Sequence, residues 1–207
     1  MLRWNRRRYD AMRSAARRNK QREFDKRKFF KEFGSWTLLI LIAVILGYSV
    51  VQFGGQTITV VGQSMNPVLE NGDKVVVSKL SYTFGEPKRF DIVAFKLRKS
   101  DEYFNVKRIV GMPGETVKIT DGKIFINDEI LENVPFDEYI LSPGSVGDGV
   151  TLSDNEYFLI GDNCNNSEDS RFSNVGNVID NEILGKVVYR LSPKENRGKI
   201  VSGGKEQ

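Results

Sequence analysis

An uncharged apolar run of 18 residues, WTLLILIAVILGYSVVQF at positions 36–53, most constrains how this chain folds. A helix crosses the hydrocarbon core of a bilayer with about 20 mainly apolar residues, whereas a buried helix that is apolar all round needs a large protein to cover it. Trp36 and Tyr48 lie toward the two ends of the run, where amphipathic rings favour the headgroup region. We therefore predict a transmembrane helix over residues 36–53.

Charge is distributed unevenly on the two sides of this predicted helix. Residues 1–33 contain 13 Arg and Lys against 4 Asp and Glu, whereas the rest of the chain contains 18 against 23. Because positive charge beside a span stays in the cytoplasm, we expect residues 1–35 to be a basic cytoplasmic segment and residues 54–207 to be extracytoplasmic. The basic segment should contact anionic lipid of the bilayer. A basic run alone is also typical of nucleic-acid binding, but beside a span no nucleic acid is expected.

The absence of histidine and the presence of one cysteine limit the chemistry of the chain. Without histidine, a Ser-His-Asp site, a Cys-His site and a His-liganded zinc are excluded. A single cysteine excludes an internal disulfide and cysteine-cluster metal sites. We expect no cofactor and no metal. Residues 162–166 have the alternate spacing of a calcium loop, but Cys164 is a poor ligand and the glycine of such loops is missing.

The sequence after residue 53 has a mainly β pattern. Short β-branched runs alternate with turn residues, and Asp121-Gly122 is a two-residue hairpin signal between two of these runs. We predict a mainly β fold, a membrane-anchored antiparallel β-domain with one N-terminal transmembrane helix and with residues 133–151 as a loop or subdomain excursion. The predicted strands are residues 74–78, 91–95, 106–110, 116–120, 123–126, 156–160 and 183–189.

Ser64 and Lys107 are the first candidate functional residues. Ser64 follows Gly62 and precedes Pro67, so its hydroxyl is expected at the exposed end of a strand, although serines in such places usually form turns or caps. In a β alternation Lys107 shares a face with Ile109, and loss of hydration there lowers the pKa of a lysine. A lysine of lowered pKa is a general base that needs no histidine. The alternative is that Lys107 extends its ammonium group to solvent.

A third polar segment, residues 160–176, combines pairable charges with many hydrogen-bonding side chains. Asp162, Asp169 and Arg171 carry the charges, and asparagines and serines surround them in the sequence. The alternative is a solvated acidic loop.

A chain that has no histidine but has a suitably placed serine and lysine can carry out acyl transfer with the lysine as base.

Four sequence blocks then make the chain resemble the type I signal peptidases, the Ser/Lys proteases of secretory membranes. The blocks occur in the family's order after an N-terminal span, and they are GQSMNPVLENGD, RFDIVAF, VKRIVGMPGE and GDNCNNSEDSR. The resemblance implies that Ser64 is the nucleophile and Lys107 the general base. It implies that Ser167 orients the lysine and that the backbone N–H of Ser64 holds the oxyanion.

The resemblance also assigns supporting roles. Asp162, Asp169 and Arg171 match residues that shape the site through ion pairs, and Arg108 is expected to pair with one of these acids. Gly62 stands where some members have a hydroxyl that stabilises the oxyanion, so a second donor would have to come from the backbone. Three positions depart from the common pattern: Phe90, Asn105 and Cys164, where Gly, an aromatic residue and Arg are frequent.

The implied substrates are secretory preproteins, whose signal peptides are cut after small residues at the first and third positions before the bond. Met65, Leu69 and Val106 match the positions that line the substrate pocket, and residues 56–61 are expected to pair with the extended substrate. The implied location is the cell membrane. The alternatives are a catalytically silent membrane-anchored homologue acting as a binding or regulatory subunit, and a self-cleaving repressor-type protein, which the span disfavours.

Overall fold

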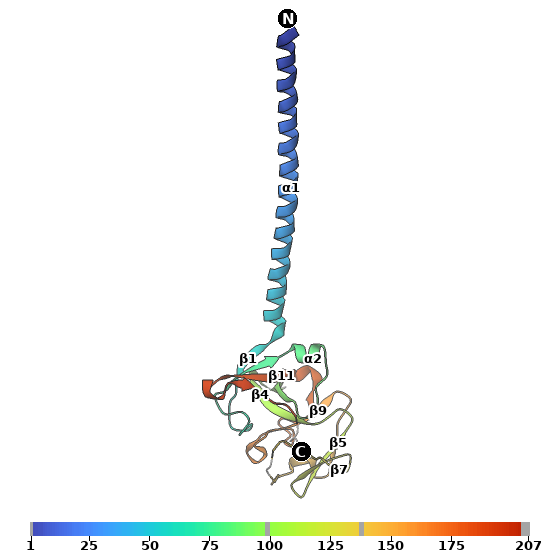
Figure 1. Cartoon of the computed structure of the whole chain (residues 1–207). Coiled ribbons are helices and arrows are strands. Elements are labelled where there is room, and N and C mark those ends of the chain that lie inside the picture. The colour runs from blue at the N-terminus through green and yellow to red at the C-terminus, as the bar shows by residue number, and fades with distance from the viewer. Residues whose placement is uncertain (1, 98–99, 137–138, 204–207) are drawn as a thin grey trace. The chain divides into compact units, whose positions relative to one another are not determined.

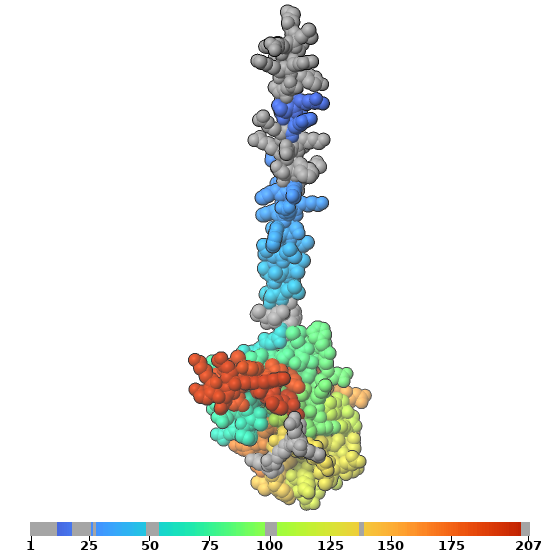
Figure 2. Space-filling model, viewed as in Figure 1, coloured from blue at the N-terminus to red at the C-terminus, as the bar shows by residue number. Residues whose placement is uncertain are grey.

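The computed structural model describes residues 2–97, 100–136 and 139–203, and it divides the chain into two compact units (Figure 1). The first unit, Met1–Gln52, is helical, because one helix, α1, runs over Leu2–Gly54 and includes the basic segment. Its stretch Lys28–Tyr48 is long and apolar enough to cross a membrane, and its side chains are exposed along the helix (Figure 2). The predicted span over 36–53 overlaps this stretch and extends beyond it.

The second unit, Phe53–Gln207, is built on antiparallel β-sheets, as the sequence predicts. The larger sheet has the strand order β1-β2-β11-β3-β4-β9-β10, with β12 also paired to β11. Its strands are β1 (Gln56–Thr59), β2 (Lys74–Ser78), β3 (Ile92–Leu97), β4 (Ser100–Gly111), β9 (Glu156–Ile160), β10 (Val178–Ile179), β11 (Ile183–Ser192) and β12 (Gly198–Lys199). The smaller sheet has the order β7-β6-β5-β8, formed by β5 (Thr116–Thr120), β6 (Lys123–Ile126), β7 (Glu129–Ile130) and β8 (Val150–Thr151).

Short helices connect these strands. One turn of α-helix, α2, covers Leu80–Thr83, and four 3₁₀ helices cover Gly144–Val146 (η1), Cys164–Asn166 (η2), Asp180–Glu182 (η3) and Lys194–Asn196 (η4). The predicted hairpin is present, because β5 and β6 pair through Asp121 and Gly122, whose φ angles of 50° and 68° are those of a type I′ turn.

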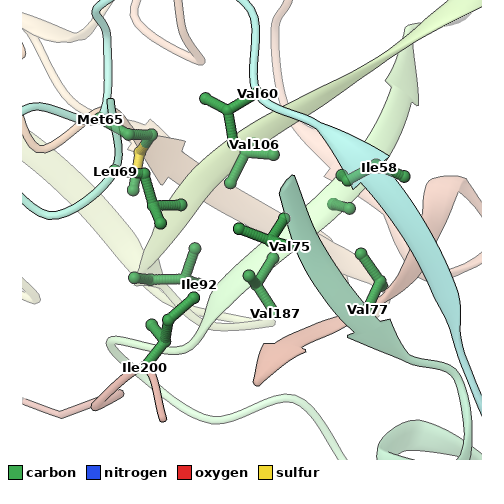
Figure 3. Packing of buried hydrophobic residues seen from close by; sticks show 11 residues of the cluster. Ile58, Val60, Met65, Leu69, Val75, Val77, Ile92, Val106, Val187 and Ile200 are labelled. Atoms are coloured by element: carbon green, nitrogen blue, oxygen red, sulfur yellow. The ribbon is translucent and has the colours of Figure 1, made fainter. Parts of the chain in front are cut away.

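Three clusters of buried apolar side chains form the core. The first lies under β1, β2, β3 and the turn after β1, and ten of its members are labelled in Figure 3. The second joins the two sheets, because Val117 and Ile124 of the smaller sheet share a cluster with Val110 and Phe158 of the larger one. The third contains Val93 and Ile109. Lys107 of β4 therefore lies between packed neighbours, because Val106 belongs to the first cluster and Ile109 to the third.

The expected excursion at 133–151 leads from β7 back to β5. Residues 137 and 138 of this segment lie outside the described residues. The rest contains η1 and β8, and β8 pairs with β5 to complete the smaller sheet.

Candidate active site

Ser64 lies in a turn that follows β1 and is closed at its base by backbone hydrogen bonds. The Val60 N–H donates to the Asp73 carbonyl at 2.8 Å, and the Gly72 N–H donates to the Val60 carbonyl at 2.9 Å. Within the turn, Gly62 has a φ of 88°, which a glycine adopts without strain. Ser64 therefore lies in a turn whose ends are held together by backbone hydrogen bonds, and its side chain is only partly buried.

Lys107 approaches Ser64 from the middle of β4. Its Nζ donates a hydrogen bond to Ser64 Oγ at 2.6 Å, across 43 positions of sequence. The lysine is only 4% exposed, so the alternative, in which Lys107 extends its ammonium group to solvent, is wrong. Burial lowers the pKa of Lys107 to about 8, against the smaller opposing effect of the nearby Asp169, Glu168 and Asp162 carboxylates. A neutral amine at this position can accept the Ser64 proton near neutral pH.

The next residue along β4, Arg108, forms a buried two-pronged ion pair. Its Nε and Nη2 atoms donate to the two Asp162 carboxylate oxygens at 2.6 and 2.7 Å, so the expected pairing with one of the acids is present. The third guanidinium nitrogen donates to the Phe90 carbonyl at 2.8 Å. The pair thus links the segment after β9 to β4, one residue from Lys107.

Asp169 and Arg171 form a second buried ion pair, with Nε and Oδ1 2.8 Å apart. The Asp169 carboxylate also accepts the Gly161 N–H at 3.2 Å, and the Arg171 guanidinium donates to the Cys164 carbonyl. These contacts are all formed within residues 160–176, and they bury the charged groups of this segment. The alternative of a solvated acidic loop is therefore wrong.

Gly161 allows this segment to approach the nucleophile closely. A Cβ atom at position 161 would lie 2.3 Å from Ser167 Oγ and 2.4 Å from the Ser64 carbonyl oxygen. Ser167 is thus packed beside the Ser64 turn. Its Oγ is buried, and among the described residues it has no hydrogen-bond partner, so no bond joins it to Lys107 here. Its orienting role stays a prediction.

Two asparagines that sequence reasoning did not assign to the site hold the turn around Ser64. Asn71 Oδ1 accepts the Gly62 N–H at 2.9 Å, so this backbone donor is already engaged within the turn. Asn163 donates its N–H to the Ser64 carbonyl at 3.0 Å and its Nδ2 to the Gln63 carbonyl at 3.1 Å. Only the motif GDNCNNSEDSR indicated a polar role for Asn163.

Residues 33–192 match the sequence profile of the family described as signal peptidase, peptidase S26. The chain belongs to this family.

Curated signal peptidases are similar to this family member over most of its length. A signal peptidase I of Leptolyngbya laminosa is 35% identical over 167 residues, which are 77% of this chain and 79% of that protein. A probable signal peptidase I-2 of Synechocystis is 30% identical, over 90% of this chain and 87% of that protein. A crystal structure of a signal peptidase I from Enterococcus faecalis aligns with 30% sequence identity and a TM-score of 0.40. The alignment covers 49% of this chain and 96% of the Enterococcus chain.

The structure shows the surroundings of Phe90 and Cys164, two of the three positions at which the sequence departs from the common pattern. Phe90 has a φ of 68°, a conformation that a glycine adopts without strain. Cys164 is 1% exposed and belongs to the core cluster between the two sheets. A buried apolar site accommodates a cysteine well, since cysteine packs as a small hydrophobic residue.

The three residues that the resemblance assigns to the substrate pocket are buried in the first core cluster. Met65, Leu69 and Val106 are 1%, 0% and 6% exposed, and Figure 3 shows Met65 beside Leu69. Cavities of about 390 and 510 Å³ lie elsewhere, lined by residues that include Ile130 and Phe136 or Tyr82 and Tyr157. The assignment of Met65, Leu69 and Val106 to a substrate pocket therefore stays a prediction. Among the described residues, no three acidic or cysteine side chains gather as metal ligands would.

Proposed function

We propose that the chain is a membrane-anchored serine endopeptidase that removes signal peptides from secretory preproteins with Ser64 as nucleophile and Lys107 as base. The observation that supports this most directly is the 2.6 Å contact between Ser64 Oγ and a Lys107 Nζ whose pKa burial lowers to about 8. Family membership supplies the reaction class, and both reacting residues lie within the matched residues 33–192.

In the first half of the reaction, neutral Lys107 accepts the Ser64 proton as Oγ attacks the scissile carbonyl carbon. The carbonyl π electrons move to oxygen, which becomes an oxyanion. In the part of the chain that the structure describes, no hydrogen bond uses the Ser64 N–H, so this group is available to the oxyanion. When the intermediate collapses, Lys107 returns the proton to the leaving amine, and the signal peptide remains as an ester on Ser64.

In the second half, a water molecule replaces the amine. Lys107 accepts its proton as the water oxygen attacks the ester, and the proton then passes to Ser64 Oγ as the acid product leaves. The buried Ser167 hydroxyl lies beside the Ser64 turn. We propose that a small rotation brings this hydroxyl to Lys107 and orients the amine.

The substrate should bind as an added strand. β1 lies at the edge of the larger sheet, and it is paired on one side only, with β2. Residues 104–107 of β4 pair with β3 but not with β9, which begins its pairing with β4 at Arg108. Both edges carry backbone groups that an extended peptide can use. A structure with a bound peptide that makes no main-chain hydrogen bonds to residues 56–61 would contradict this proposal.

Residues 1–35 should be cytoplasmic, with the helix crossing the cell membrane once and the β unit on the outer side. The charge asymmetry of the sequence supports this orientation. The structure contributes a stretch of helix, Lys28–Tyr48, that is long and apolar enough to cross. This location would bring the catalytic residues to preproteins that are still tethered by their signal peptides.

The test is cleavage of a detergent-solubilised preprotein by the wild type and by Ser64→Ala, with sequencing of the new amino terminus. We expect a cut after a small-x-small triplet in the wild type and no cut with Ser64→Ala. Equal cleavage by both proteins would refute the nucleophile. No cleavage by the wild type would favour a silent, subunit-like protein.

A further inference from the structure

Asn163 binds both peptide units that flank the Cα atom of Ser64. Its backbone N–H donates to the Ser64 carbonyl at 3.0 Å, and its side-chain Nδ2 donates to the Gln63 carbonyl at 3.1 Å. The Gln63 carbonyl and the Ser64 N–H belong to the same peptide unit. One asparagine therefore restrains the backbone of the proposed nucleophile on both sides.

The side-chain contact has a directional consequence. A trans peptide unit is planar, and its C=O and N–H bonds point in opposite directions. The Gln63 carbonyl oxygen accepts from Asn163 Nδ2 and also, at 3.2 Å, from the Asn66 N–H of the same turn. By helping to fix this oxygen, Asn163 also helps to fix the direction of the Ser64 N–H. A hydrogen bond to the carbonyl further polarises the unit and makes the N–H a better donor.

This restraint matters because few donors are available for an oxyanion. The Gly62 N–H is engaged by Asn71 Oδ1, and position 62 has no side-chain hydroxyl. Among the described residues no hydrogen bond uses the Ser64 N–H, and it is the donor that the proposed function assigns to the oxyanion. A donor stabilises a transition state only when it points at the place where charge develops.

We propose that Asn163 is a positioning residue for the oxyanion, which acts by holding the Gln63–Ser64 peptide so that the Ser64 N–H faces the scissile carbonyl oxygen. The inference rests on the proposed function, because it assigns Asn163 to that same reaction. Asn163 itself touches no reacting atom in this scheme.

The chain offers a matched control two residues away. Asn165 lies on the other side of Cys164, and its carboxamide binds a different segment: its Oδ1 accepts the Leu141 N–H and its Nδ2 donates to the Tyr139 carbonyl, each at 2.9 Å. Asn165→Ala removes a carboxamide of the same loop that is bonded to residues 139 and 141, and we expect the Ser64 peptide to keep its orientation in this variant. Asn163→Asp nearly preserves the shape of the side chain and removes the donor.

The experiment measures kcat and KM of preprotein cleavage for the full chain in detergent, with the wild type, Asn163→Ala, Asn163→Asp and Asn165→Ala. Loss of one oxyanion donor lowers kcat by about 10²–10³ in other hydrolases, so a misdirected donor should lower kcat roughly 10-fold or more in both Asn163 variants. KM and the thermal midpoint should match those of Asn165→Ala, which should retain wild-type kcat. Each rate is taken on the high-pH plateau, where a change in the Lys107 pKa has no effect.

Wild-type kcat in both Asn163 variants would overturn the inference, and so would an equal loss in Asn165→Ala. If Asn163→Ala does not fold, Asn163→Asp decides by the same criteria. If the wild type does not cleave, the proposed function fails, and crystal structures of the wild type and of Asn163→Asp decide the positioning separately. A Gln63–Ser64 peptide that keeps its orientation in the variant would then refute the inference, and a rotated peptide would support only its structural part, the restraint of the Ser64 N–H by Asn163.

Discussion

Lys107 is buried beside Ser64, and this position determines the pH at which its amine is neutral. Burial removes water from the ammonium group and lowers its pKa to about 8. Because the chain has no histidine, no imidazole side chain is present to titrate near neutral pH. The pH dependence of cleavage should therefore report mainly on this one lysine.

Cleavage should rise with pH through an apparent pKa of about 8, because only the neutral amine accepts the Ser64 proton. The measurement is kcat/KM for a preprotein between pH 6 and pH 10, at constant ionic strength. Lys107→Met should reduce kcat/KM by a factor of about 10²–10⁴. A profile that stays flat through pH 8, or an active Lys107→Met, would refute the role of this lysine.

The same burial should cost stability. Lowering the pKa of Lys107 from 10.5 to about 8 corresponds to about 3 kcal/mol, since one pKa unit is about 1.4 kcal/mol. Below pH 8 the lysine is charged in both states and the folded protein bears the full cost. Between pH 8 and 10.5 the unfolded chain binds more protons than the folded one, so the free energy of unfolding rises with pH.

Lys107→Met should therefore be inactive but more stable than the wild type, by up to about 3 kcal/mol at pH 7. Its advantage should shrink as the pH rises toward 10.5. Urea denaturation followed by circular dichroism at pH 7 and pH 9.5 tests this. A variant that is less stable than the wild type at pH 7 would show that packing of the lysine stem outweighs the cost of burying its charge.

At the scale of the elements, the Arg108–Asp162 ion pair joins β4 to the segment after β9. Both side chains are 1% exposed, and the pair has two short hydrogen bonds. Removing one partner leaves a buried charge without compensation, which costs about 3–5 kcal/mol in other proteins. We therefore expect the pair to hold β4 against the segment after β9, next to Lys107.

Asp162→Asn should lower the free energy of unfolding by roughly 3 kcal/mol or more, whereas the double variant Arg108→Met/Asp162→Leu should recover most of this loss. Arg197→Ala removes an exposed arginine and serves as the control, with an expected change within about 0.5 kcal/mol. Thermal denaturation of the four proteins gives the comparison. A double variant as unstable as Asp162→Asn would indicate that apolar packing cannot replace the ion pair between β4 and the segment after β9.

The elements also show what could be read from the sequence. The strands with clear β-branched runs have the predicted limits at β2, β5, β6 and β9, and β4 extends further than predicted, to Ser100. The two-residue strands β7, β8, β10 and β12 were not predicted, because such short segments have no period and depend on their neighbours. The contact from Asn163 to Gln63 spans 100 positions and likewise leaves no local signal.

At the scale of the whole molecule, the basic segment and the apolar run form one helix, while the β unit has its own core. The positive charge of the segment predicts which end stays inside the cell. A C-terminal tag should be removed by protease added to intact spheroplasts, whereas an N-terminal tag should be lost only after permeabilisation. The reverse pattern would show that the β unit faces the cytoplasm.

Cys164 is the sole cysteine of the chain, and it is packed in the core between the two sheets. A maleimide dye should therefore leave the native protein unlabelled and react only after unfolding. The wild type can accept one engineered reporter thiol at a time, such as Ser14→Cys on α1 or Lys194→Cys on the β unit, both at exposed positions. Fluorescence spectroscopy of either part thus requires no prior removal of a native thiol.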